Sequence, residues 1–566
     1  MKKLLVGLLG LITFYACNQT TASTSASTVL YYNGDIITMA DSIAQYAEAL
    51  VVKDGKILFV GTKSAAEKEA GSSATLIDLQ GKTLLPGFID AHSHVAQGIN
   101  SITEINVSCP PVGNCSSVAD IIKTIEAFKV KNNIANGEWL MAWGYDNELI
   151  SEKRHPNLTE LDKAFPNNPV IMAHVSGHMA VCNSAALKLA NITAQTKDPA
   201  GGHIERDAKG NLTGLLQENA AFLMVSVIPQ ISMDKKVALL DDVINQYAEN
   251  GYTTIQEGLS DHQTFELLTK AVAKKPFQLD VISLLDSKDI DRYINDKTMV
   301  FGKYSNGLKW GGIKIVGDGS PQGKTAYFLK PYCNHGICDA KDGFRGAPNL
   351  SASELDSLFY KCYTHNIQLY MHCNGDASVD MFLQSNEKNK TVGTANDRRS
   401  VIIHSQFVNR NQLAQIKAHH IIPSFFTNHA YFWGNVHRNN LGEERANFLS
   451  PIATADSMGI VYTNHTDFRI TPLDPMFVLW TAVNRLSREG VVIGTKERAT
   501  PYQALKGITS NVAYQYFEEK EKGKLIEGYT ADLVILDKNP LKVEPQLIKD
   551  IKVLETIKDG KLVFKR

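Results

Sequence analysis

The feature that most constrains the fold is a long alternation of short apolar runs and amphipathic segments between residues 83 and 463. Apolar runs that alternate with helical patterns predict a parallel sheet with helices packed outside it, the α/β class. Eight runs have the length and composition of strands, which is the number in a (β/α)8 TIM barrel. They are Thr83–Ile89, Thr253–Gln256, Gln278–Leu285, Gly312–Val316, Gln368–His372, Val401–His404, Ile421–Ser424 and Gly459–Thr463.

The spacing of these runs predicts the domain organisation. The interval between the first two is too long for one crossover, so a barrel domain over 85–490 is expected to carry an inserted α/β subdomain at about 100–250. The flanking segments 29–84 and 491–566 are rich in β-formers and contain hairpin signals such as Asn33-Gly34 and Asp54-Gly55. We expect the two chain ends to pair into one small β-sandwich, with a helix at the start of the second.

The first residues have a different character. Lys2 and Lys3 precede an apolar run that ends at Ala16, directly before Cys17. This run is too short to span a bilayer but suits a signal peptide. Residues 1–17 resemble a bacterial lipoprotein signal, with Cys17 as the lipid-bearing residue and 18–28 as a flexible tether; ordinary secretion is the alternative. We therefore expect an exported protein, lipid-anchored in the bacterial envelope, either facing the periplasm or at the cell surface.

Export affects the interpretation of the cysteines. Cys109 and Cys115 are close in sequence, as are Cys333 and Cys338. Each pair is expected to close a small disulfide loop in an oxidising compartment. A zinc clamp is the less favoured alternative, because neither pair has the usual two-residue spacing.

The charge balance limits the class of partner. Lys and Arg number 58 and Asp and Glu 59, a formal net charge of -1. A nucleic-acid-binding protein would show a basic excess. We expect a small-molecule substrate, no nucleic-acid partner and membrane contact only through the anchor, and leave a homodimer open.

Polar residues stand at the ends of several candidate strands, where the active sites of barrels form. His92 and His94 alternate after the first strand, so both can reach one metal ion. Lys314 lies among apolar residues, where a cation is costly unless it is neutralised, paired with Asp318 or able to reach solvent. The others are His372, His404 and Asp467. Asp467 is either a metal ligand that also shuttles protons or a helix N-cap.

These motifs together resemble the amidohydrolase superfamily, in the family 3 branch that includes N-substituted formamide deformylase. The resemblance covers nearly everything after the tether. It depends on an ordered set of segments: Leu85–His94, Ser176–Leu187, Ile313–Gly323, His372–Ala377, Val401–Gln406, Asn428–Gly434 and Asp467. One departure is Thr466, since the family usually has a small residue, often Ser, before the last Asp.

The resemblance implies a site with two divalent metal ions, expected to be zinc. His92 and His94 would hold the more buried ion and His372 and His404 the other, with Lys314 bridging them as a carbamate. Asp467 would ligate the first ion and exchange protons during catalysis.

The implied activity is hydrolysis of a C–N bond in an amide, formamide or N-acyl compound by a metal-bridging hydroxide. A deaminase or cyclic-amide hydrolase of the same superfamily is the alternative, and a ligand-binding surface lipoprotein is less favoured. His178 and His429 are candidate substrate contacts, with hydrogen-bonded scaffold histidines as the equally weighted alternative.

Overall fold

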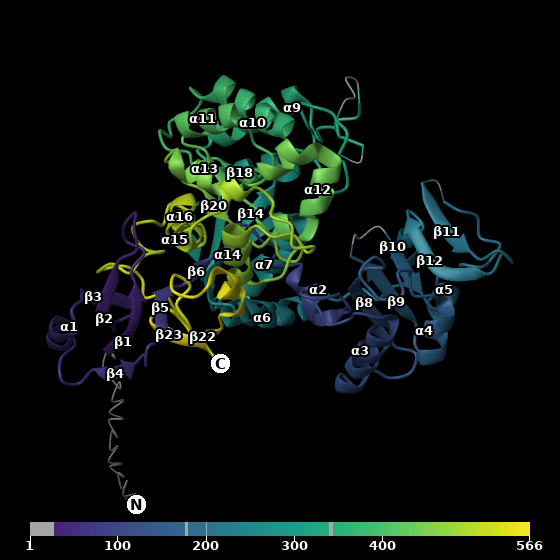
Figure 1. Ribbon diagram of the computed structural model, residues 1–566, viewed down its shortest axis with the longest axis horizontal. Helices are drawn as coiled ribbons and strands as arrows, with labels where there is room; N and C mark the ends of the chain where they lie inside the picture. The colour runs from purple at the N-terminus through teal and green to yellow at the C-terminus, as the bar shows by residue number, and fades with distance from the viewer. Residues whose placement is uncertain (1–27, 176–178, 200, 335, 339–342) are drawn as a thin grey trace, which may run out of the picture.

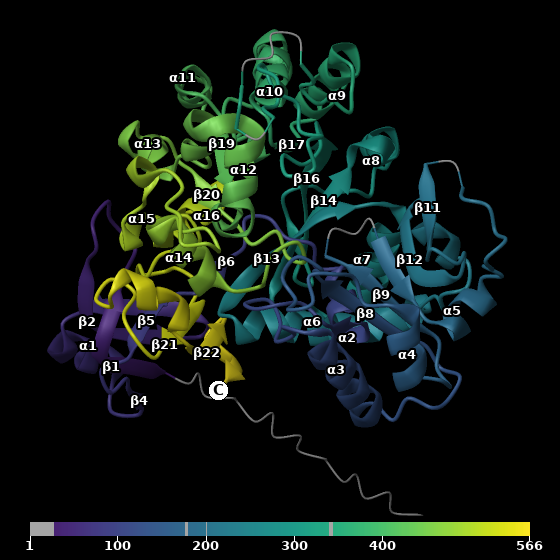
Figure 2. The ribbon, with the colours of Figure 1, turned by 45° about the vertical axis from the view of Figure 1, so that its right-hand side comes forward.

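The computed structural model describes residues 28–175, 179–199, 201–334, 336–338 and 343–566. These residues form three sheets: a central parallel sheet, a sheet made from both chain ends, and a separate sheet between the first two strands of the central one. Figures 1 and 2 show the last of these as a lobe beside the central body.

The central sheet contains eight parallel strands in sequence order, each overlapping or adjoining a run predicted from the sequence. Such strands are buried on both faces and therefore read as nearly continuous apolar runs. They are β6 (Phe88–Ile89), β13 (Tyr252–Ser260), β14 (Asp280–Asp286), β16 (Leu308–Val316), β17 (Leu369–Cys373), β18 (Val401–His404), β19 (Ile422–Phe425) and β20 (Thr463–Asn464).

The two edge strands of this sheet, β6 and β20, do not pair with each other directly. A short segment forms hydrogen bonds to both of them. Asn464 N donates to Gly507 O at 2.8 Å, and Ile89 N donates to Ile508 O at 2.9 Å. Both edge strands are only two residues long, and Pro86 before β6 has no N–H to donate. The parallel α/β sheet thus has the predicted strand order, and the segment between α15 (Pro501–Lys506) and α16 (Ser510–Gln515) bridges its edges.

Several of the helices that connect these strands bury an apolar face. In α7 (His262–Lys274) that face contains Leu267, Leu268 and Ala271, and Asp261 caps the helix by accepting from Thr264 N at 2.8 Å. Helix α6 (Met233–Glu249) also packs into the central core. It therefore returns the chain from the lobe to β13.

The chain ends share one eight-stranded sheet, in the order β23-β22-β21-β5-β1-β2-β3 with β4 beside β1 (Figure 1). Its bounds are β1 (Val29–Ile37), β2 (Tyr46–Lys53), β3 (Lys56–Gly61), β4 (Thr75–Asp78), β5 (Thr83–Pro86), β21 (Leu533–Leu536), β22 (Val553–Lys558) and β23 (Lys561–Lys565). The ends meet where β5 and β21 pair antiparallel. A two-layered sandwich stays a prediction.

One hairpin prediction is wrong. Asn33-Gly34 lies inside the single strand β1, where the register with β2 shifts. Pairing of β1 with β2, β4 and β5 keeps the chain extended on both sides of the bulge, overriding the local turn signal. Asp54-Gly55 does connect β2 to β3, with both residues at positive φ as a type I′ turn requires.

The lobe lies within the interval where an insertion is expected. Its sheet has the order β11-β12-β10-β9-β8-β7, with α3 (Val118–Lys131), α4 (Leu158–Ala164) and α5 (Ser184–Leu189). The strands are β7 (Ile105–Asn106), β8 (Leu140–Tyr145), β9 (Val170–His174), β10 (Met179–Cys182), β11 (Gly202–Arg206) and β12 (Leu212–Glu218). The lobe has apolar clusters of its own.

The two cysteine pairs differ. Cys333 and Cys338 form a disulfide. Cys109 and Cys115 are separate buried thiols, so the disulfide expected there is wrong in this structure. The Cys115 Sγ lies 3.3 Å from Thr124 Oγ1 on α3. No helix in the described part of the chain is long and apolar enough to cross a membrane.

Candidate metal centre

The carboxyl ends of the central strands bring together the six predicted ligands, which lie up to 375 residues apart in sequence. His92 and His94 follow β6, and Asp467 follows β20 at the other edge of the sheet. The edges are held together here because Asp467 N donates to His92 O at 3.0 Å. Lys314 and His372 lie near the ends of β16 and β17, and His404 ends β18.

His92, His94 and Asp467 form the tightest group. One potential ligand atom from each lies within 4.8 Å of the other two. The Oδ1 atom of Asp467 is 3.6 Å from His92 Nε2 and 3.5 Å from His94 Nε2. Two imidazoles and a carboxylate converging on one point suit a divalent ion such as zinc. The donor set therefore fits the implied metal.

The remaining predicted ligands adjoin this group. The Lys314 Nζ atom lies 3.4 Å from His92 Nε2. The rings of His372 and His404 have centroids 4.5 Å apart, and those of His92 and His404 5.4 Å apart. The six side chains thus form one cluster, in which His94 and His372 are partly exposed and the other four are buried.

The environment of Lys314 excludes two alternative interpretations: a side chain that extends to solvent, and an ion pair with Asp318. The residue is 3% exposed, so it does not extend to solvent. Asp318 does not pair with it, because its carboxylate accepts backbone N–H groups from Tyr327, Asn374 and Gly375, each at 2.9 Å. Burial lowers the pKa of Lys314 to about 8, although the charge of Asp467 opposes this.

Asp467 is held as a carboxylate. Its burial alone would raise the pKa, but the hydrogen bond from His94 and the charges of His94, His465 and Lys314 keep that pKa below its ordinary value. A charged carboxylate can both ligate a metal and accept a proton. This geometry favours a ligand over a helix N-cap, since no helix begins at Asp467.

The sequence analysis missed the group that orients His92. Gln256 Nε2 donates to Ala91 O at 2.9 Å and to the Tyr516 hydroxyl at 2.6 Å, which directs Gln256 Oε1 toward His92 Nδ1 at 2.7 Å. His92 Nδ1 therefore carries the hydrogen, and the lone pair of Nε2 is directed into the space that His92 shares with Asp467 and Lys314. Such an outer partner fixes the tautomer that binds a metal.

Three more polar residues surround the cluster. His465 Nε2 lies 3.1 Å from His404 Nδ1, and its Nδ1 lies 2.9 Å from Ser424 Oγ. Glu257 Oε1 lies 3.7 Å from His94 Nδ1. A sequence signal for Gln256 and Glu257 does exist: both are polar residues in the apolar strand β13, and buried polar side chains need a partner.

Of the two candidate substrate contacts, the structure describes only His429. His178 lies outside the described residues. His429 lies in the first turn of α12 (Asn428–Asn447), and its ring is 4.7 Å from the ring of Phe426, which itself is 4.9 Å from that of His465.

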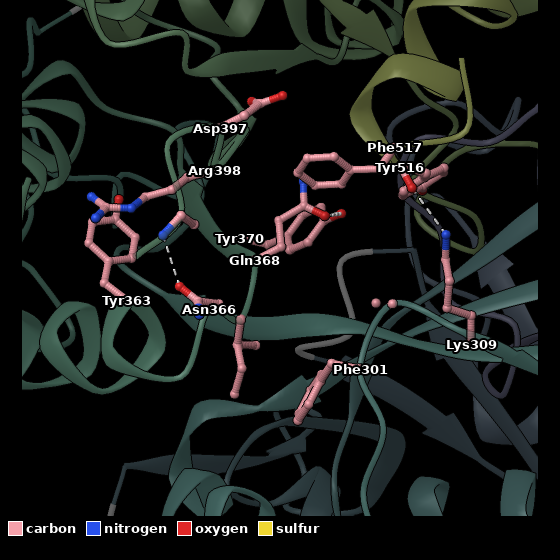
Figure 3. A pocket seen from close by; sticks show the side chains of 14 residues that line it. Phe301, Lys309, Tyr363, Asn366, Gln368, Tyr370, Asp397, Arg398, Tyr516 and Phe517 are labelled. Atoms are coloured by element: carbon pink, nitrogen blue, oxygen red, sulfur yellow. Dashed lines mark hydrogen bonds between the residues drawn. The ribbon is translucent and has the colours of Figure 1, made fainter. Parts of the chain in front are cut away.

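A cavity of about 240 Å³ lies at the opposite, amino-terminal ends of β16 and β17 (Figure 3). Gln368 in its wall donates to the carbonyls of Arg399 and Gln515, and the Tyr370 hydroxyl donates to Gln368. Lys309 Nζ donates to Tyr516 O. These polar groups are satisfied by the protein, whereas Arg398 Nε in the same wall is buried without a hydrogen-bond partner in the described part of the chain.

Comparisons with known proteins identify the family of this chain. The sequence profile of the amidohydrolase family, in its family 3 form, matches residues 75–564. The chain is 28% identical to the N-substituted formamide deformylase of Arthrobacter pascens, covering 95% of this chain and 98% of that protein. It is 27% identical to the putative amidohydrolase YtcJ of Bacillus subtilis, covering 95% and 99%.

Solved structures agree in fold. An uncharacterized metal-dependent hydrolase from Pyrococcus horikoshii superposes with a TM-score of 0.71 at 22% identity, covering 92% of this chain and 99% of that one. The corresponding protein from Pyrococcus furiosus gives 0.70 at 22% identity, covering 91% and 100%. With its α/β fold and its candidate metal-binding residues, the chain belongs to the amidohydrolase family.

Proposed function

We propose that this protein hydrolyses a C–N bond in a small amide, formamide or N-acyl compound with the help of two divalent metal ions. The observation that carries the proposal is the convergence of His92, His94 and Asp467 on one point, with Lys314 Nζ 3.4 Å from His92 Nε2. Family membership supports the same reaction class.

In this proposal His92, His94 and Asp467 would hold one ion and His372 and His404 the other, and Lys314, converted to a carbamate by carbon dioxide, would contribute ligand oxygens. When bound, the ions acidify a water molecule and polarise the substrate carbonyl group. The proposed metal is zinc, which suits imidazole-rich sites.

The chain's own residues then supply orientation and proton transfer. Gln256 keeps the Nε2 lone pair of His92 available, as its 2.7 Å contact with Nδ1 implies. Asp467 accepts a proton on a carboxylate oxygen and passes it to the leaving nitrogen, so that an amine and a carboxylic acid (formic acid from a formamide) leave the site.

The first experiment compares metal content and activity in the purified wild type and in Lys314→Ala. We expect about two bound metal ions per wild-type chain and, in the variant, a large loss of both metal and activity, because the bridging group is gone. Lys417→Ala, at an exposed lysine on α11 (Arg410–Ala418), is the matched control and should behave as wild type.

The substrate is then sought among formamides, N-acyl amines and N-acyl amino acids, with release of amine as the readout. Similarity to the Arthrobacter enzyme places N-substituted formamides first. Wild-type protein that holds no metal after careful purification, or full metal loading and activity in Lys314→Ala, would falsify the proposal.

A further inference from the structure

Two buried histidines on one helix form a contact that takes no part in the proposed chemistry described above. His429 Nδ1 and His437 Nε2, both on α12, are 3.0 Å apart. The two rings are nearly parallel, at 3°, and the His429 ring also lies against that of Trp433, with centroids 4.3 Å apart. His429 is 3% exposed and His437 is fully buried.

Both rings are neutral. Burial lowers the pKa of His437 to about 3, and burial together with the charges of nearby histidines lowers that of His429 well below its ordinary value. A neutral imidazole has one N–H and one bare nitrogen. One ring therefore donates across the 3.0 Å contact and the other accepts.

The ring nitrogen of His437 that does not contact His429 indicates which of the two rings donates. His437 Nδ1 is buried and has no hydrogen-bond partner in the described part of the chain. If His429 donated, this atom would carry a buried N–H without an acceptor, which is rarer in proteins than an unused acceptor. If His437 donates from Nε2, its Nδ1 is bare and both rings adopt the Nε2–H form that neutral histidine prefers in water.

The consequence appears at His429. With its Nδ1 accepting, its hydrogen is on Nε2. In the described part of the chain no residue hydrogen-bonds to that atom. The metal cluster is adjacent, because Phe426 contacts both His429 and His404, with ring centroids at 4.7 and 5.6 Å.

We infer that His437 is a positioning residue that holds His429 as an Nε2–H donor toward the substrate's carbonyl oxygen. The role of His429 at the substrate rests on the proposed function, whereas the tautomer does not. A donor at this place selects substrates with an acceptor oxygen. It stabilises the negative charge that grows on this oxygen during attack more than it stabilises the bound substrate.

The test combines a tautomer measurement with kinetics. In protein labelled at histidine 13Cδ2, the His429 resonance, assigned through its loss in His429→Gln, should report the Nε2–H form in the metal-loaded wild type. His437→Phe keeps a flat ring but removes the donor, so the tautomer of His429 is no longer fixed and its resonance should move away from the wild-type position. We expect kcat to fall about fivefold to tenfold with little change in KM.

His437→Gln restores an N–H donor at the same place and should recover most of the lost kcat and the wild-type resonance. His365→Gln, at an exposed histidine that follows α9 (Ala352–Thr364), controls for loss of a histidine as such. An Nδ1–H signal for wild-type His429, or a His437→Phe enzyme with unchanged resonance and kcat, overturns the inference. Absence of hydrolysis in the wild type would contradict the proposed function, while the resonance still tests the tautomer.

Discussion

At the residue scale, Thr466 stands where the family usually has a small residue, often Ser, and its hydroxyl makes the hydrogen bonds that a serine would make. Thr466 Oγ1 donates to Asp90 Oδ2 at 2.6 Å, and the Thr466 backbone N donates to Asp90 Oδ1 at 3.3 Å. The same hydroxyl oxygen accepts from Phe468 N at 3.1 Å. These bonds tie the loop that carries Asp467 to the end of β6. A threonine supplies them as a serine does.

Replacing Thr466 by valine tests this tie. The variant keeps the volume but leaves buried Asp90 without its side-chain donor, and burial already raises the pKa of Asp90 to about 7. We expect a loss of about 1–3 kcal/mol in the free energy of unfolding and a fall in activity, because the Asp467 loop is less well held. Denaturant titration and kcat measure the two effects. Thr466→Ser should match the wild type, and unchanged stability in Thr466→Val would contradict this reading.

At the scale of elements, buried ion pairs join the central sheet to the sheet of the chain ends. Lys522, in the segment after α16, lies 2.6 Å from Asp280 at the start of β14 and 2.9 Å from Glu518. Lys558 at the end of β22 lies 3.0 Å from the same Asp280. Burial alone would raise the pKa of both carboxyls, but Lys522 and Lys558 hold that of Asp280 below its ordinary value. Lys522 and Lys309 do the same for Glu518.

Removing the central cation with Lys522→Met should cost about 3–5 kcal/mol of unfolding free energy at neutral pH, because two buried carboxylates lose a partner. Lys520→Met, two residues away and exposed, is the matched control and should cost almost nothing.

The pH dependence of this cost has a definite sign. Carboxyls with a lowered folded pKa stabilise the wild type fully above their unfolded pKa of about 4, and this contribution is lost as the pH falls through the folded pKa. In Lys522→Met the same groups are favoured in the protonated form, so the deficit should shrink on acidification. Urea titrations at several pH values check this, and a deficit that grows toward acid would contradict it.

At the scale of the whole molecule, the sheet formed by the two chain ends leads directly into the strand that precedes the candidate metal centre. Strand β5 pairs with β21, and β5 leads through Pro86 and Gly87 directly into β6, which His92 and His94 follow. The first strand of the central sheet is therefore anchored at one end by the C-terminal segment.

The predicted lipid anchor lies in the N-terminal segment, outside the described residues. We propose that Cys17 carries lipid and that the protein is exported. In a bacterial host, the wild type should incorporate labelled palmitate and partition into detergent, whereas Cys17→Ser should do neither. Ser23→Ala, in the tether, serves as the control. Equal labelling of Cys17→Ser and the wild type would show that Cys17 is not the acceptor.

Much of the central sheet, and the placing of the candidate ligands at its edge, could be predicted because the signals are local. Runs such as Val401–His404 have the composition of buried parallel strands, and a polar residue at a strand end points to the shared edge. Asn33-Gly34 was misread because its turn signal is local, while the pairing that overrides it comes from strands elsewhere in the chain.

The sequence by itself determined the family, the strand order and the six side chains that meet at the sheet edge. Only the tertiary structure decided how those side chains are held. Gln256 reaches His92 across 164 residues, and His465 reaches His404 across 61. The physical reason is that a tautomer or a pKa depends on which atoms lie within hydrogen-bonding distance after folding, and no local pattern encodes those neighbours.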